Sequence, residues 1–183
     1  MENLKIKIWT IGHSTRSLDD FLALLKENNI RALADVRRFP GSRRHPHFGQ
    51  DQLAGSLASE QIEYVHFPEL GGRRNPLPDS ANTAWRVPAF RGYADYMTTR
   101  EFRAGIERLL NLAQNKPTAI MCAEALWWQC HRGLISDFLK SNGHEVLHIM
   151  GKNKIEPHPY TSAAQMLDGK LSYQKTDPQA QLI

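Results

Sequence analysis

Two cysteines, a carboxylate, an imidazole and a guanidinium fall within eleven positions of this chain. The run starts at Cys122-Ala123-Glu124 and ends at Cys130-His131-Arg132. A thiol reacts as its thiolate, which a nearby histidine, arginine or helix N-terminus favours. Histidine and glutamate often carry protons in enzymes. These residue types predict a catalytic site in which Cys130 is the nucleophile or redox thiol and His131 and Glu124 transfer protons.

The cysteines have two other interpretations. Free cysteines are often small buried hydrophobic residues, so Cys122 and Cys130 can equally pack a strand against a helix. A metal site would use Cys122, Cys130 and His131, with or without His13. Zinc sites usually contain closely spaced pairs such as Cys-x-x-Cys, and the chain has none. We therefore expect no metal and no other cofactor, and free thiols rather than a disulfide.

Known loop patterns do not fit the run. In the anion-binding loops of rhodaneses and tyrosine phosphatases, an arginine follows the cysteine by a few positions and the intervening N–H groups surround an anion. Here the sixth residue after Cys122 is Trp128, and only His131 separates Cys130 from Arg132. The sequence also lacks the Gly-x-Ser-x-Gly turn, the phosphate-binding P-loop and the dinucleotide-binding glycine pattern. None of these site types is expected.

The elements that must position this run are predicted strands and helices that alternate along the sequence. Apolar, β-branched runs predict strands at Ile6–Ile11, Ile30–Val36, Ile62–Phe67, Thr118–Cys122 and Glu145–Met150. Helical spacing predicts helices at 17–29, where Ser17 and Asp20 resemble a capping box, at Gln50–Glu60, at Tyr93–Gln114 with a break at Thr98-Thr99, and at Gly133–Asn142. This alternation is typical of crossover units. The expected fold is a single α/β domain with a mainly parallel sheet of about five strands and helices on both faces, Rossmann-like.

The carboxyl ends of parallel strands share one edge of a sheet, and open α/β folds bind ligands there. Polar residues follow the first and second predicted strands, the cysteine run follows the fourth, and Glu69 and Arg73 follow the third. We therefore predict one pocket at this edge. Its catalytic residues would be Cys130, His131, Glu124 and Asp35, and its anion-binding residues would be His13, Ser14, Arg37, Arg73 and Arg132.

Arginine carries the positive charge in the middle of the chain. Twelve arginines and no lysine lie between Glu27 and Lys116, and the formal net charge is +4. Arginine binds phosphate or carboxylate through paired hydrogen bonds, so the expected partner is an anionic small molecule or a nucleic acid. Alternatively, these side chains pair with acidic residues nearby. A further alternative is a non-catalytic nucleic-acid-binding module that contacts phosphates through Arg37, Arg38, Arg43, Arg44, Arg73 and Arg74.

The chain of 183 residues fits one domain, 1–183. The segment after Gly151 is polar and contains prolines, so 151–183 is expected to be a partly irregular arm over the domain, with a loose end. No stretch approaches the ~18 apolar residues of a membrane helix, and the N-terminus has no signal peptide. A soluble, cytoplasmic protein that does not enter membranes is expected.

Several motifs, in order, are similar to those of the domain-of-unknown-function family DUF488. They are Thr10-Ile11-Gly12-His13-Ser14, Asp35-Val36-Arg37, Pro68-Glu69-Leu70-Gly71-Gly72, Phe90-Arg91-Gly92-Tyr93, Cys122-Ala123-Glu124 and Cys130-His131-Arg132. The resemblance extends from about Trp9 to Tyr173. Gly133 departs from the pattern, where an arginine or a serine is expected. The resemblance implies a bacterial or archaeal cytoplasmic protein, and it implies no particular reaction.

Overall fold

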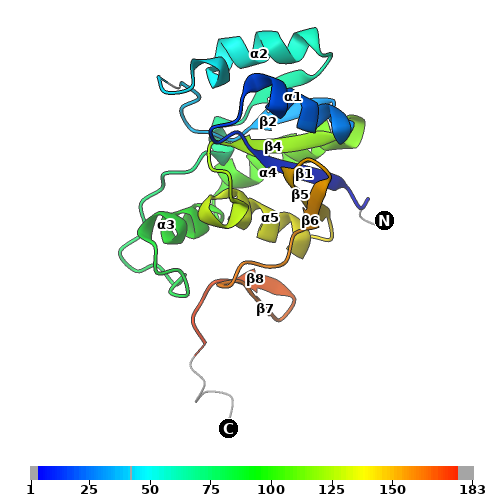
Figure 1. Cartoon of the computed structure of the whole chain (residues 1–183). Helices are drawn as coiled ribbons and strands as arrows, with labels where there is room; N and C mark the ends of the chain where they lie inside the picture. The colour runs from blue at the N-terminus through cyan, green and yellow to red at the C-terminus, as the bar shows by residue number, and fades with distance from the viewer. Residues whose placement is uncertain (1–3, 42, 177–183) are drawn as a thin grey trace.

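Within residues 4–41 and 43–176, which the computed structural model describes, the chain forms a six-stranded, mostly parallel sheet (Figure 1). The strands are β1 Lys7–Gly12, β2 Ala32–Asp35, β3 Glu63–His66, β4 Thr118–Cys122, β5 Glu145–Gly151 and β6 Lys154–Pro157. Their order is β3-β2-β4-β1-β5-β6. The predicted α/β fold with a mainly parallel sheet is confirmed. The strand that the sequence did not predict is β6, which pairs antiparallel with β5.

Helices cover both faces of the sheet, as the sequence predicted (Figure 1). One face carries α1 and α2, and the other carries α3, α4 and α5. Their bounds are α1 Leu18–Glu27, α2 Gln50–Ser59, α3 Pro88–Tyr96, α4 Arg100–Asn115 and α5 Arg132–Ser141. Each face buries its own apolar cluster, with Phe21 and Phe48 in the first and Phe102 and Ile135 in the second. Since β4 is covered on both sides, its run Thr118–Cys122 is buried throughout.

The central position of β4 brings the predicted site residues together. β4 lies between β1 and β2, and its register places Cys122 beside Gly12. Hydrogen bonds continue the ladder past the strand ends, from His13 N to Cys122 O and from Val36 N to Met121 O, both at 3.0 Å. Because the three strands are parallel, their C-terminal residues meet at one edge.

Helix α3 starts earlier than the sequence predicted. Its first residue is Pro88, whereas the prediction placed the start at Tyr93. Proline fits the first turn of a helix because the N–H groups there have no partner within the helix. The predicted break at Thr98-Thr99 is confirmed, since Thr99 caps α4 by accepting a hydrogen bond from Phe102 N.

Short 3-10 helices shape the loops at the C-terminal ends of the strands. They are η1 Pro46–Phe48, η2 Pro68–Leu70 and η3 Trp127–Gln129. η1 and η2 each begin with a proline, and η3 contains the tryptophan pair of the cysteine run. Trp127 is buried and stacks on His148, while Trp128 is exposed. η3 thus lies between Cys122-Ala123-Glu124 and Cys130-His131-Arg132 as a separate short helix before α5.

The segment after Gly151 contains regular structure as well as irregular parts. β6 extends the sheet, and β7 (Gln165–Leu167) and β8 (Lys170–Ser172) form an antiparallel hairpin. β8 contacts α5, and Tyr173 is buried in the apolar cluster on that face. The segment therefore lies over the domain and is anchored in the core by a few buried side chains, Tyr173 among them. The expected loose end beyond Thr176 lies outside the described residues.

Ser17 caps α1, as its spacing to Asp20 predicted. Its hydroxyl accepts a hydrogen bond from Asp20 N at 3.1 Å and donates one to Asp20 Oδ2 at 2.7 Å. We expect Ser17→Ala to lower the free energy of unfolding by about 1 kcal/mol in urea titrations. Ser56→Ala is the control, because Ser56 lies inside α2. Equal costs for the two variants would contradict a capping role.

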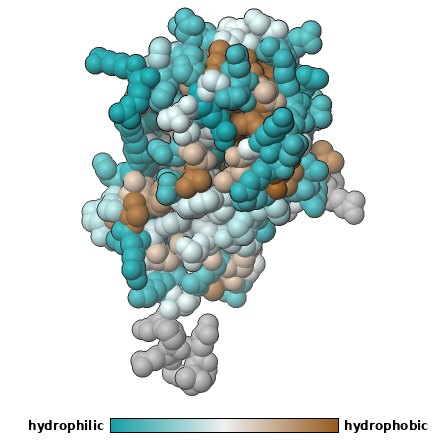
Figure 2. Space-filling view, viewed as in Figure 1, coloured by the Kyte–Doolittle hydropathy of each residue, from teal (hydrophilic) through white to brown (hydrophobic). Residues whose placement is uncertain are grey.

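Among the described residues, no helix combines the length and the apolar character that crossing a membrane requires. On the face shown in Figure 2, hydrophobic residues form separate patches between hydrophilic side chains. Large apolar side chains with high exposure include Phe39 at 67% and Trp128 at 46%. Phe39 is also part of the wall of a pocket at the C-terminal edge of the sheet.

Candidate active site

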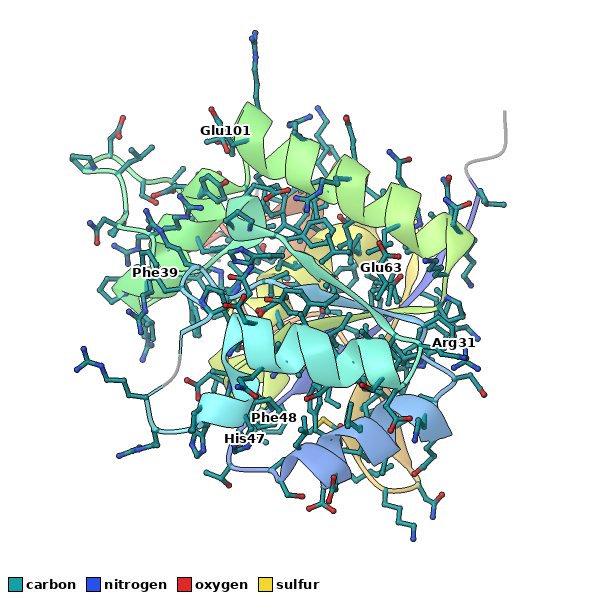
Figure 3. All side chains as sticks on the ribbon, turned by 90° about the horizontal axis from the view of Figure 1, so that it is seen from above. Arg31, Phe39, His47, Phe48, Glu63 and Glu101 are labelled. Atoms are coloured by element: carbon teal, nitrogen blue, oxygen red, sulfur yellow. The ribbon has the colours of Figure 1, made fainter. Side chains whose placement is uncertain are left out.

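A pocket of about 660 Å³ opens at the C-terminal edge of the sheet. Its walls come from the loops after β1, β2 and β4, from Gly72 and Arg73 in the loop after β3, and from α3. In Figure 3, Phe39 and Phe48 lie toward this edge, whereas Arg31 and Glu63, where β2 and β3 begin, lie toward the opposite edge. Small-molecule sites typically occupy ~300 to 1,000 Å³. The pocket is therefore large enough for a ligand of nucleotide size.

Most of the predicted site residues line this pocket. Those that do are His13, Ser14, Arg37, Arg73, Glu124, Cys130 and His131. Cys122 lines it as well. Asp35 and Arg132 are instead buried behind the wall, with 0% and 1% of their surfaces exposed. These two residues can therefore influence a ligand only indirectly, by positioning the groups that they contact.

Cys122, Cys130 and His131 form a cluster at the pocket wall. His131 Nδ1 lies 3.5 Å from Cys130 Sγ and 4.0 Å from Cys122 Sγ. The two sulfurs and this nitrogen all lie within 4.8 Å of one another, and both thiols are free. The end of β4 faces the start of α5, which explains why cysteines without a Cys-x-x-Cys spacing meet. Such a cluster can supply a nucleophile, a redox pair or a set of metal ligands.

A backbone carbonyl fixes the His131 ring. Nε2 donates a hydrogen bond to Val36 O at 3.0 Å, because a carbonyl oxygen can only accept. In the neutral ring Nδ1 therefore carries the lone pair, on the side of the two sulfurs. Tyr93 packs on the ring with the centroids 5.1 Å apart. The imidazole is thus held ready to accept a thiol proton or to bind a cation.

The two thiols differ in acidity. Burial opposes ionisation of Cys130, but the hydrogen bond with Cys122 and the neighbouring His131 hold the pKa of Cys130 well below its usual value. The hydrogen bond with Cys130, together with burial, raises the pKa of Cys122 well above its usual value. Arg132 N also donates to Cys130 Sγ at 3.5 Å. Of the two thiols, Cys130 is therefore the one that ionises more readily, and Cys122 is the one that keeps its proton.

Asp35 holds Arg37 in place. Its carboxylate accepts hydrogen bonds from Arg37 Nε at 2.9 Å, from Arg37 Nη2 at 2.6 Å and from the Tyr64 hydroxyl at 2.6 Å. This two-point pair directs Arg37 Nη1 to His13 Nε2, 3.4 Å away. Because Asp35 does not line the pocket, these contacts suit a positioning carboxylate better than a proton carrier.

His13 is a neutral part of the pocket wall. Its Nδ1 donates to Ser14 O at 3.0 Å, which leaves Nε2 to accept from Arg37. Burial lowers the pKa of His13 to about 4. The ring also stacks on Phe48, with the centroids 4.3 Å apart. Both ring nitrogens are engaged by the protein, so His13 offers a ligand a neutral, flat surface rather than positive charge.

Arginines converge on the pocket from different loops. Arg37, Arg38, Arg44 and Arg73 all line it. In the described part of the chain, Arg38, Arg44 and Arg73 form no ion pair with a carboxylate. Arg38 Nη1 donates to Arg73 O at 2.9 Å, which links the loop after β2 to the loop after β3. These guanidinium groups give the pocket the charge that an anionic ligand requires.

A buried polar chain that the sequence analysis missed lies behind Arg132. Arg132 Nη1 donates to Thr10 Oγ1 at 3.4 Å, and Thr10 Oγ1 lies 2.7 Å from His148 Nδ1. His148 Nε2 lies 2.9 Å from His158 Nδ1, and His158 Nε2 donates to Asp137 Oδ1 at 2.8 Å. Burial lowers the pKa of His148 to about 2, so this ring is neutral. The chain connects a buried cation to a buried carboxylate.

Two signals in the sequence point to this chain. His148 interrupts an apolar strand, and Asp137 interrupts the apolar face of a helix. Charged or polar residues at such positions need a buried partner. Their partners Thr10 and His158 come from β1 and from the segment after β6, and no local pattern connects these segments.

Residues 17–139 match the family described as Domain of unknown function DUF488. The matched region contains Arg37, Arg73, Glu124 and the cluster of Cys122, Cys130 and His131, while His13 and Ser14 lie before it. No match was found among curated proteins or among solved structures. Because the matched residues make up more than half of the 183, the chain belongs to the DUF488 family.

Proposed function

We propose that this protein is an enzyme that binds an anionic substrate, such as a phosphate ester or a nucleotide, and acts on it with the Cys122, Cys130 and His131 cluster. The observation that carries this proposal is that unpaired arginines and an acidified thiol line the same pocket. Arginine binds oxyanions with defined geometry. The arginines would therefore hold the anionic group while the cluster faces the rest of the substrate.

Cys130 is the group expected to react. Its proton can pass to His131 Nδ1, 3.5 Å away, and the thiolate that forms accepts hydrogen bonds from Arg132 N and from the Cys122 thiol. Attack on an electrophilic atom of the substrate forms a bond to sulfur and breaks the bond to a leaving group. The proton that His131 received would then pass to the leaving group, and Glu124, exposed at the pocket wall, would relay it.

A non-catalytic nucleic-acid-binding module is the main alternative. Such a module needs arginines along an open face or groove, where they follow a phosphate backbone. Arg37, Arg38, Arg44 and Arg73 instead converge on a pocket that contains both thiols. Arg74 packs on the Tyr96 ring. Oligonucleotide binding that weakens steeply with salt, in a protein whose thiols are inert, would favour the binding module.

Alkylation with iodoacetamide tests the enzyme proposal. In reduced, chelator-treated protein we expect Cys130 to be alkylated at neutral pH much faster than Cys122, as followed by peptide mass spectrometry. The rate at Cys130 should stay nearly constant from neutral to mildly alkaline pH and fall only in acid, because its pKa is lowered. Inorganic phosphate or a nucleotide should slow the reaction by occupying the pocket.

The matched control separates pocket binding from ionic strength. Chloride at equal ionic strength should protect Cys130 less than phosphate does, and Arg73→Gln should weaken the protection by phosphate. Two cysteines that are both inert at neutral pH, in protein shown to be folded by circular dichroism, would rule out thiol chemistry. Equal effects of chloride and phosphate would rule out an anion site in this pocket.

A further inference from the structure

Three ligand atoms at one wall of the pocket have nearly the spacing of a tetrahedral metal site. A tetrahedral zinc ion ~2.3 Å from two sulfurs and ~2.0 Å from an imidazole nitrogen separates each sulfur from the nitrogen by about 3.5 Å. His131 Nδ1 lies 3.5 Å from Cys130 Sγ and 4.0 Å from Cys122 Sγ. An ion can therefore bind between these atoms after a small shift of the Cys122 side chain.

The groups around the cluster are those that metal ligands usually have. A ligating histidine generally donates from its other ring nitrogen to a carbonyl or carboxylate, which fixes the tautomer and the ring orientation. His131 does so from Nε2 to Val36 O. Arg132 N points at Cys130 Sγ, a contact that stabilises negative charge on the sulfur. The lone pair of His131 is therefore aimed at the sulfurs, and Cys130 Sγ has a backbone donor that would stabilise its negative charge, before an ion binds.

One side of the cluster is open to the pocket. Gly72 lies beside His131, and a Cβ at this position would stand only 2.8 Å from Nδ1. The missing side chain leaves space next to the ligand atom. Catalytic zinc sites differ from structural ones in having three protein ligands and one position for water or substrate. The cluster offers three ligands and lines the same pocket as Glu124.

We propose that Cys122, Cys130 and His131 bind a zinc-like divalent cation whose fourth coordination position faces the arginine-lined pocket. This inference rests on the proposed function, because the ion would act on the same anionic substrate. A bound zinc ion supplies a Lewis acid and an activated water molecule. In the metal-bound enzyme the two sulfurs would be ligands, and the activated water would attack the substrate in place of the Cys130 thiolate and displace the leaving group. Glu124 would accept the proton of the water and pass it to that leaving group.

Elemental analysis of untagged protein, purified after growth with added zinc, is the first test. We expect about one zinc ion per chain in the wild type. Cys122→Ser, Cys130→Ser and His131→Gln should each lose most of it, while His144→Gln should retain it because His144 lies outside this pocket. Circular dichroism establishes whether each variant is folded. Loss of zinc from His144→Gln as well would contradict a site at the cluster.

Gly72→Ala is the sharper variant, because it keeps all three ligands. Gly72 does not adopt a positive φ, so alanine fits the backbone while its Cβ crowds His131 Nδ1. We expect Co²⁺ binding, followed by the thiolate-to-cobalt absorption, to weaken at least about tenfold, as changes next to metal ligands do. Gly55→Ala is the control, because a Cβ there meets open space. Equal affinities in the two variants would contradict an ion beside Nδ1.

The proposed metal site and the proposed anion pocket can be rejected independently of each other. Wild-type protein that carries almost no zinc, and gives no thiolate-to-cobalt absorption after reduction and addition of Co²⁺, would overturn the metal inference. If phosphate still protects Cys130 in that protein, the proposed function stands without a metal. If zinc binds but phosphate has no effect on the metal-free protein, the metal site stands and the anionic substrate is rejected.

Discussion

Asp137→Asn is expected to lower the free energy of unfolding by about 3 kcal/mol or more, as measured by urea titration with circular dichroism. The Asp137 carboxylate is fully buried and accepts hydrogen bonds from His158 Nε2, Thr161 N, Thr161 Oγ1 and Tyr173 Oη. An asparagine has one oxygen in place of two, and its amide group would face a donor. At least one buried donor would then lose its acceptor. A buried polar group without a partner lowers the free energy of unfolding by more than the simple loss of one hydrogen bond does.

Asp168→Asn is the matched control for this substitution. Asp168 is exposed in the turn between β7 and β8 and has a φ of 49°, a left-handed conformation that asparagine also tolerates. Its replacement should change stability by no more than about 0.5 kcal/mol. If Asp137→Asn costs under about 1 kcal/mol, the buried chain from Asp137 to Arg132 contributes little to the fold.

The Asp137 cluster also explains how the C-terminal segment supports the site. His158, Thr161 and Tyr173 all come from the segment after β6 and converge on α5 through Asp137. From Asp137 the polar chain reaches Arg132, the buried cation next to Cys130. Among the described residues Arg132 has no carboxylate partner, so backbone carbonyls and Thr10 fix its position. The segment therefore stabilises the group that favours the Cys130 thiolate.

Local patterns were enough to predict the sheet and its C-terminal edge. The strands of the parallel sheet are apolar runs bounded by glycine, proline or polar residues, and parallel pairing then requires their carboxyl ends to meet. His13, Arg37 and the cysteine run were predicted to share a pocket on this ground alone. His13, Arg37 and the cluster of Cys122, Cys130 and His131 line one, whereas Arg132 lies behind its wall. The short, polar strands after Gly151 could not be predicted, because β6 is defined by its pairing with β5 rather than by its own composition.

The sequence offered Cys122, Cys130 and His131 as a possible metal-ligand set, but spacing rules could not predict that these side chains meet. Spacing rules for zinc sites describe ligands on one turn or hairpin, where a fixed number of residues sets the distance. Here Cys122 is fixed by strand pairing and Cys130 by the 3-10 helix before α5. Their approach depends on how α5 packs on the sheet. Tyr64 was missed similarly, since its contact with Asp35 depends on the pairing of β2 with β3.

Gly12→Ala is expected to destabilise the protein by about 3 kcal/mol and to disturb the site. Gly12 ends β1 beneath the loop 123–126, and a Cβ there would stand 2.7 Å from the carbonyl carbon of Glu124 and 2.9 Å from Ala125 Cα. Both atoms belong to the backbone, so no side-chain rotation relieves the overlap. Arg132 Nη2 donates to the carbonyls of Glu124 and Ala125 and holds the loop against β1. Either β1 or the loop must therefore move.

Two measurements on Gly12→Ala separate a general loss of stability from a displaced loop. Urea titration gives the first, and Gly55→Ala is its control, since alanine in the open middle of α2 should stabilise the protein by roughly 0.5 to 1 kcal/mol. The alkylation rate of Cys130, measured without urea, gives the second. The loop follows Cys122, contains Glu124 and is tied to Arg132, so its displacement should slow alkylation even in fully folded protein. If Gly12→Ala is as stable and as reactive as the wild type, the loop can move without cost. The hydrogen bonds from Arg132 to the loop would then not be needed to position the cluster.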